Sequence, residues 1–270
     1  YAVKNLKKGI EFLEQQFGVK WDWDAFWKNA EMYNESSRCM IEKWDVNCTE
    51  HPQVCGAALA LQREYEFMAA ACMDKFMLKT DRRVTKMMLK GYEQDKAANA
   101  PQPKYRCLVW ACPAHYYTNF TYWTQHCWGV TCVNDMEAML SYQPITIGDK
   151  EQALADLVRC YEKMMMRSHT NGGYVNLLDE CWKMCEKFHT NIVIMYDHVS
   201  CKNVGGLHGL FEDQARERGI HLIWIPHDVM DPRTVSRREM REAFSQYMVT
   251  VLNEKPLDPT LLDYEDTLSW

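Results

Sequence analysis

Residues 191–234 constrain the fold of this chain more than any other part of its sequence. Within them, residues 192–196 form an unbroken apolar and aromatic run, which is typical of a strand covered on both faces in a parallel sheet. Gly205 and Gly206 then let the backbone turn tightly into a helix. This order places Cys201 at the carboxyl end of a strand, where open α/β sheets bind ligands and cofactors.

The rest of the chain predicts two structural regions, a linker and a tail. Residues 1–98 are predicted to be helical, and residues 99–103 (Asn-Ala-Pro-Gln-Pro) form a breaker-rich linker. Residues 104–252 alternate strands with helices, which predicts an α/β, Rossmann-like unit with a mostly parallel sheet and helices on both faces. Residues 253–270 are expected to form an extended C-terminal arm. The expected strands are 105–110, 130–134, 192–196 and 221–225, and the expected helices of the α/β unit are 115–128, 150–167, 174–188, 207–218 and 236–251.

Helix boundary signals divide the first region into four helices. Either Asp22 or Asp24 is expected to cap the second helix, and Pro52 fits the first turn of the third. Asp81 is expected to cap the fourth, whose inward face includes Met87. The tryptophans and methionines of this region are interpreted as core residues.

Composition and charge exclude two classes of partner. The net charge is −6 and the basic residues are scattered, so we expect no nucleic-acid binding. No apolar run approaches the roughly 18 residues that a membrane helix needs. Twelve cysteines in 270 residues, without a Cys-x-x-Cys pair, indicate free thiols in a reducing compartment. We therefore expect a cytoplasmic protein.

The first residue, Tyr1, already lies inside a predicted helix. No initiator methionine, basic leader or cleavage site precedes it. The sequence is therefore interpreted as a fragment that lacks an amino-terminal part.

Reactive side chains follow three of the expected strands, whose carboxyl ends share one edge of the sheet. His115 and His227 are weaker candidates for proton donors, and Asp228 and Asp231 are expected to cap turns. No phosphate loop and no Gly-x-Gly-x-x-Gly turn is present. The loops expected to converge are residues 111–115, 197–202 and 226–233.

Cys201 has three possible roles at this edge. As a nucleophile, its thiol would gain thiolate character from Lys202, His198 and the following helix amino terminus. As an iron–sulfur ligand it would use the same thiolate, with turn amides donating hydrogen bonds to sulfur. A single cysteine without a partner is by default an inert, buried thiol.

On these residues the chain resembles the 2-hydroxyacyl-CoA dehydratase and benzoyl-CoA reductase family, and within it the C-terminal portion of a catalytic subunit similar to the 2-hydroxyglutaryl-CoA dehydratase D-component. The most specific pieces are the cysteine turn DHVSCKN and the Asp-Pro-Arg block of GIHLIWIPHDVMDPRTVSRREMREAF. The other matching pieces are LKKGIEFLEQQFGVKWDWDAFWKNAEMYNE, KYRCLVWACPAHY and KPLDPTLLDYEDTLSW.

The resemblance implies a 4Fe-4S cluster held by three cysteines. Cys201 matches one of these ligands, and the other two would lie in the part that precedes Tyr1. It also implies a second related catalytic subunit, an acyl-CoA substrate and a separate iron–sulfur activator that hydrolyses ATP. The activator would supply the electron that reduces the thioester to a ketyl radical, after which a dehydratase expels hydroxide. His198 and Lys202 would supply a proton or positive charge near the developing oxyanion, or would only orient the loop.

Three other functions remain open. A benzoyl-CoA reductase subunit would use the same parts for ATP-dependent reduction of an aromatic acyl-CoA. A non-catalytic scaffold or partner subunit would use the α/β unit only to shape an interface. A thiol-nucleophile enzyme would use Cys201 without iron.

Overall fold

The computed structural model describes residues 1–53, 55, 75–136, 143–163 and 165–263. The third helix expected after Pro52 falls outside the described residues, as does the end of the expected C-terminal arm. None of the described helices has the length and the apolar character that crossing a membrane requires. The helices are α1 (Ala2–Phe17), α2 (Trp23–Asn47), α4 (Lys75–Ala97), α5 (Phe120–Trp128), α6 (Lys150–Lys163), α7 (Met165–Lys187), α8 (Lys202–Gly205), α9 (His208–Arg218) and α10 (Arg237–Thr250), with 3-10 turns η2 (His115–Tyr117) and η3 (Pro259–Leu261); the strands are β1 (Tyr105–Trp110), β2 (Val130–Asp135), β3 (Ile192–His198) and β4 (His221–His227).

The described strands form one parallel sheet with the order β2-β1-β3-β4, which confirms the expected α/β class. The central strands β1 and β3 are buried along most of their length, which explains their continuous apolar runs. Pairing of β3 with β4 extends to His198 opposite His227. Both strands are therefore longer than expected, because backbone hydrogen bonding continues after the apolar run ends.

Helices cover both faces of the sheet, as expected. On one face, Phe120 of α5 packs against Tyr196 of β3 and Phe244 of α10, with ring centroids 6.1 and 5.8 Å apart. On the other face, Trp182 of α7 lies 5.7 Å from Phe211 of α9. These edge-to-face aromatic contacts join α5 and α10 on one side, and α7 and α9 on the other.

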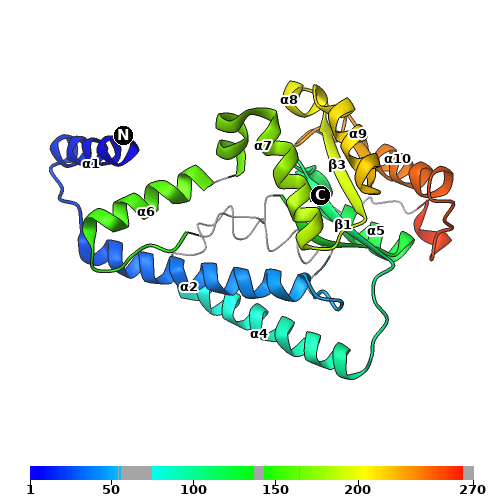
Figure 1. The fold of residues 1–270 in the computed structure, drawn as a ribbon, viewed down its shortest axis with the longest axis horizontal. Coiled ribbons are helices and arrows are strands. Elements are labelled where there is room, and N and C mark those ends of the chain that lie inside the picture. The colour runs from blue at the N-terminus through cyan, green and yellow to red at the C-terminus, as the bar shows by residue number, and fades with distance from the viewer. Residues whose placement is uncertain (54, 56–74, 137–142, 164, 264–270) are drawn as a thin grey trace.

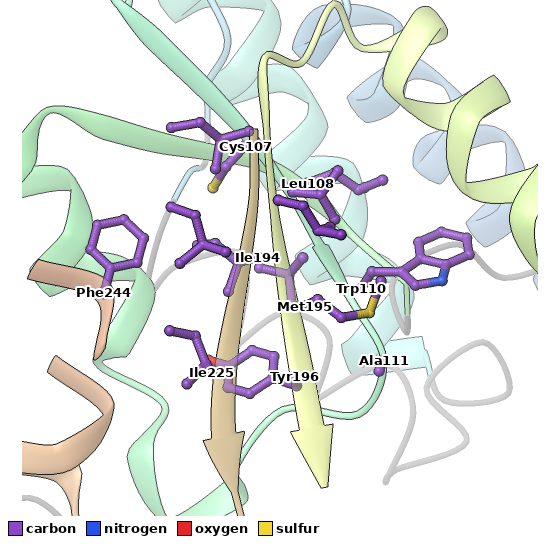
Figure 2. Close-up of a cluster of buried hydrophobic side chains, with 14 of the residues drawn as sticks. Cys107, Leu108, Trp110, Ala111, Ile194, Met195, Tyr196, Ile225 and Phe244 are labelled. Carbon is purple, nitrogen blue, oxygen red and sulfur yellow. The ribbon is translucent and has the colours of Figure 1, made fainter. Parts of the chain in front are cut away.

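Successive side chains of β3 point to opposite faces of the sheet. Figure 2 shows Met195 directed toward Trp110, while Ile194 is directed to the opposite side, toward Phe244. All four side chains are almost completely buried. This alternation is the ordinary consequence of the strand pleat, and it gives the sheet an apolar layer on each side.

The helix α6 does not cover the sheet, although its sequence lies within the predicted α/β unit. It packs instead against α1 and α2, where Ala153 and Ile145 form a small buried cluster with Ala30. An ion pair of 2.5 Å between Lys7 and Glu151 also joins α1 to α6. Figure 1 shows α6 beside the N-terminal helices, and α2 and α4 packed side by side.

The predicted role of Asp81 is wrong, because this residue lies within α4 rather than at its start. Its buried carboxylate accepts hydrogen bonds from Ser36 Oγ at 2.6 Å and from Lys43 Nζ at 2.9 Å, both on α2. A carboxylate that has a buried ammonium opposite it is stable in a helix interior, where sequence alone suggests a cap. Met87 is also exposed rather than directed inward.

The cap of α2 agrees with the sequence prediction, whereas the glycine turn at the end of α8 has a different backbone conformation from the one expected. Asp22, not Asp24, caps α2 by accepting a hydrogen bond from a backbone amide of its first turn at 2.9 Å. Gly205 ends α8, and Gly206 has a right-handed backbone with φ −71°. A Cβ atom on Gly206 would lie 2.9 Å from the carbonyl oxygen of Lys202, so the close approach of backbone, rather than an unusual φ, requires glycine here.

A buried arginine joins the helical region to the sheet. The Arg106 guanidinium, from β1, donates to the carbonyl of Thr49 at 2.7 Å and to that of Phe188 at 3.0 Å, and it also contacts the carbonyl of Asn47. Burial lowers the pKa of Arg106, but guanidinium groups remain charged in proteins. One cation therefore binds backbone that follows α2 and backbone that follows α7.

We expect Asp81→Ala to destabilise the chain by about 3–5 kcal/mol, because it removes the carboxylate that faces a buried ammonium. Urea unfolding at pH 7, followed by circular dichroism, measures this difference. Glu35→Gln is the matched control, because Glu35 joins the same two helices through an exposed ion pair with Arg82 and should cost much less. Equal losses of unfolding free energy in the two variants would contradict the conclusion that the buried Asp81–Lys43 pair contributes more than the exposed Glu35–Arg82 pair.

Candidate functional site

The order of the strands creates a switch point between β1 and β3. The chain moves from β1 to β2 on one side and then crosses back to β3 on the other. In open α/β sheets, a crevice for ligands forms at the carboxyl ends of the two strands where the order reverses. The loops that follow β1 and β3 therefore border the candidate site, and the loop after β4 lies next to them.

Backbone hydrogen bonds confirm that the three expected loops converge. The amide of His115, after β1, donates to the carbonyl of Val229, after β4, at 2.9 Å. The amide of Val199, after β3, donates to the carbonyl of His227 at 3.1 Å. These bonds connect the loops directly and hold their side chains at one edge of the sheet.

Cys201 lies where the sequence places it, just beyond the end of β3. It is the N-cap residue of α8, with an extended backbone at φ −85° and ψ 92°, and its side chain caps no helix amide. The residue is half-buried and packs against the apolar core. The helix that follows it is a single turn, and the longer α9 begins only at His208. The helix dipole near the thiol is therefore smaller than the sequence suggests.

His198 and Lys202 flank this thiol in different environments. Nδ1 of His198 accepts a hydrogen bond from the Ser200 amide at 2.9 Å, so the neutral ring carries its proton on Nε2. The carbonyl of His198 accepts from the Cys201 amide at 2.8 Å, which closes the turn. Lys202 is exposed, and within the described part of the chain its ammonium forms no ion pair. Its charge is therefore available to an anionic group at this edge of the sheet.

His227 is the most buried polar side chain of the site, with 0% exposure. Its ring is nearly perpendicular to that of His198, with centroids 5.4 Å apart, and it packs on Tyr196 at 5.0 Å. Among the described residues, neither ring nitrogen makes a well-aligned hydrogen bond, although backbone groups of Cys112 and Asp197 lie close enough to favour the charged form. Burial, with a smaller contribution from His198, lowers the pKa of His227 to about 4. His227 is therefore neutral at physiological pH.

The loop after β1 contributes two features that the sequence analysis did not single out. Ala111 has a left-handed backbone with φ 65°, which is unusual for a residue with a Cβ atom. It is followed by Cys112, whose Sγ lies 3.8 Å from Nε2 of His115. A Cys-Pro pair directly after a buried strand is the only sequence signal for this arrangement.

Two carboxylates after β4 are turn residues, as expected. Oδ1 of Asp228 accepts from the amides of Met230 and Asp231 at 2.9 Å, and these bonds lower its pKa. The side chain of Arg233 holds the pKa of Asp231 at about 2. Both groups are ionised and satisfied within their own loop, so neither is a proton donor at neutral pH.

The described residues do not form a complete metal site by themselves. No group of three or more histidine, cysteine or acidic side chains able to hold a metal ion occurs among them. Cys201 supplies a half-buried thiol with an apolar side behind it, which suits a single ligand of an iron–sulfur cluster. Further thiolates would have to come from outside the described residues.

We expect stability to fall as pH decreases from about 6.5 to about 4 because of His227. In this window the unfolded chain, with an ordinary pKa of 6.5, binds a proton that the folded chain does not. His227→Phe, which keeps an aromatic ring in the site, should reduce this dependence. Urea unfolding of both proteins at pH 7 and pH 5 measures it, and equal losses on acidification would contradict a buried neutral imidazole.

Comparison with known proteins identifies a family. A search of curated proteins gives no match. The family model described as "2-hydroxyglutaryl-CoA dehydratase, D-component" matches residues 1–248, which include the three loops and Cys201. Because the match covers most of the chain, the protein belongs to this family of dehydratase-type enzyme subunits.

Proposed function

We propose that this chain is part of a catalytic subunit of an iron–sulfur-dependent 2-hydroxyacyl-CoA dehydratase, which removes water from a 2-hydroxyacyl-CoA. The observation that carries this proposal is the position of Cys201, half-buried at the carboxyl end of β3 and beside the switch point, in a chain of this family. Ligands bind at this position in other α/β sheets.

The Cys201 thiolate would bind one iron of a 4Fe-4S cluster, with the remaining ligands supplied by other parts of the protein. When bound, such a cluster supplies low-potential electrons to a thioester carbonyl. The apolar core behind Cys201 would exclude water and help to keep the potential low.

Side chains near Cys201 would then stabilise the negative charge that develops on the substrate. The exposed ammonium of Lys202 would stabilise negative charge on the thioester oxygen, by the same electrostatic logic as an oxyanion hole. Nε2–H of His198 would donate a hydrogen bond to the departing hydroxide, because Nδ1 already accepts from the Ser200 amide and the ring is neutral. The neutral ring of His227 would shape this side of the crevice without adding charge.

The proposed partners are a second related catalytic subunit and a separate activator that hydrolyses ATP and carries its own iron–sulfur cluster. The substrate class is acyl-CoA. We further propose a cytoplasmic location, because all cysteines of the described residues are free thiols, as in a reducing compartment.

We expect Cys201→Ser to lose most of its iron and sulfide after anaerobic reconstitution of the protein with its related subunit. A serine hydroxyl is a poor ligand for iron–sulfur clusters, which are held by thiolates. Cys160→Ser is the matched control, because Cys160 is also half-buried but lies on α6 and contacts Tyr33 at 3.4 Å, away from the sheet edge. Iron and sulfide analysis measures both variants. Equal cluster content in wild type and Cys201→Ser would remove the central assignment.

Activity assays distinguish a dehydratase from a benzoyl-CoA reductase. With activator and ATP present, the dehydratase proposal requires turnover of a 2-hydroxyacyl-CoA. Turnover of benzoyl-CoA alone would identify the subunit as a reductase, and intact clusters without either activity would support a non-catalytic role.

Two substitutions separate the two roles of His198. His198→Asn keeps a side-chain oxygen that can accept from the Ser200 amide, while His198→Ala removes both this acceptor and the Nε2–H donor. If Nε2–H of His198 stabilises the departing hydroxide, both variants should lose about 10²-fold or more in kcat with unchanged iron content. If His198 only orients the loop, His198→Asn should retain nearly full activity, and the donor role would be wrong.

A further inference from the structure

A thiol and an imidazole face each other at the end of β1. Cys112 Sγ lies 3.8 Å from His115 Nε2 and also 3.8 Å from the carbonyl oxygen of Pro113. Both Cys112 and His115 are half-buried, so each keeps some exposure to solvent. A nucleophile within hydrogen-bond reach of a base, with the base held in place, is the arrangement used by covalent catalysts.

The backbone holds this pair in a fixed geometry. The left-handed Ala111, with φ 65°, turns the chain sharply as it leaves the buried strand. Non-glycine residues adopt this conformation at a cost, and such strain concentrates at functional sites. Pro113 stiffens the link between the two side chains, and the amide of His115 is bound to the carbonyl of Val229 at 2.9 Å.

Cys112 differs from the other half-buried cysteines that the structure describes. Burial raises the pKa of Cys48, and it raises that of Cys55 further. Cys160 contacts the Tyr33 hydroxyl and the carbonyl of Gln143. Among the described cysteines, Cys112 is the one whose sulfur lies within hydrogen-bonding distance of an imidazole, which is a partner that can convert a thiol into a nucleophile.

We propose that Cys112 and His115 form a nucleophilic pair that accepts the acyl group of a thioester bound at the switch point. His115 takes the thiol proton, Cys112 Sγ bonds to the acyl carbon, and the bond from that carbon to the original thioester sulfur breaks. The proton then passes from His115 to the departing thiolate. One thioester replaces another, so no oxidant or reductant is needed. The choice of a thioester rests on the proposed function; the pairing of the two side chains does not.

Other titratable groups surround the pair. His198 and His227 end the neighbouring strands β3 and β4, and the backbone of Cys112 lies near the His227 ring. The Asp228 carboxylate, in the loop after β4, is engaged by two backbone amides. His227 is neutral and Asp228 is ionised, so neither of these two groups adds positive charge beside the thiol.

Alkylation of the full chain under reducing, anaerobic conditions tests the pair. Iodoacetamide at pH 7, with peptide mapping by mass spectrometry, should modify Cys112 about tenfold faster than Cys160. His115→Gln should slow Cys112 by a similar factor and shift its pH–rate midpoint upward. Butyryl-CoA should acylate Cys112 in the wild type, releasing free CoA thiol, and should not do so in Cys112→Ser.

The outcomes distinguish this inference from the proposed function. Cys160→Ser is the control that should leave both reactions of Cys112 unchanged, because Cys160 lies on α6 and contacts Tyr33 and Gln143. The pairing of Cys112 with His115 needs no cluster, so iron binding by Cys201 is a separate question. If Cys112 reacts no faster than Cys160, or if His115→Gln changes nothing, the pair is not activated and the inference is wrong. Rapid alkylation of Cys112 without acylation by butyryl-CoA would contradict the proposal that the pair accepts an acyl group from a thioester. Iron binding by Cys201 is tested separately, by iron and sulfide analysis. If a variant fails to fold, the pH dependence of Cys112 alkylation in the wild type, compared with that of Cys160, still tests whether the Cys112 thiol is activated.

Discussion

The parallel pairing of β1 with β3 positions the two loops that carry Cys112 and Cys201. Cys107 to Trp110 pair in register with Ile192 to Met195, in the centre of a sheet that is apolar on both faces. Because the chain leaves these two strands in opposite directions, their carboxyl ends form the switch point at which α/β sheets bind ligands. The switch point therefore follows from the side-by-side pairing of two buried apolar runs, and the polar loops supply the side chains around it.

The chemistry that the loops after β1, β3 and β4 can perform depends on how deeply each of their polar groups is buried. His227 is enclosed and neutral, Lys202 is exposed and charged, and Cys201, Cys112 and His115 lie between these extremes. Half-burial suits a thiol that must both meet a ligand and stay away from bulk water. The two thiols also stand in different settings, because Cys112 faces an imidazole whereas Cys201 has apolar side chains behind it. This difference supports separate roles for them.

The sequence predicts the sheet well because burial on both faces leaves a direct signature. The runs that form β1 and β3 begin where expected, and the turn at Cys201 follows from the end of one run. Strand ends are less predictable, since His198 and His227 continue the backbone pairing with side chains that are not apolar. The position of α6 is also not encoded locally, because an amphipathic helix can bury its face against any apolar surface. Asp81 and Ala111 show the same limit: a partner on another helix and a strained φ angle are properties of the folded chain.

The contacts of Arg106 join the helical region of the chain to the sheet. Its guanidinium binds carbonyls from the end of α2, from the loop after it and from the residue after α7, while its own backbone exchanges hydrogen bonds with Asn191 just before β3. Without residues 1–98, this guanidinium would lose the carbonyls of Thr49 and Asn47 and keep that of Phe188. The linker therefore separates two kinds of secondary structure that share a buried cation, and the α/β unit expressed alone would present that cation to water.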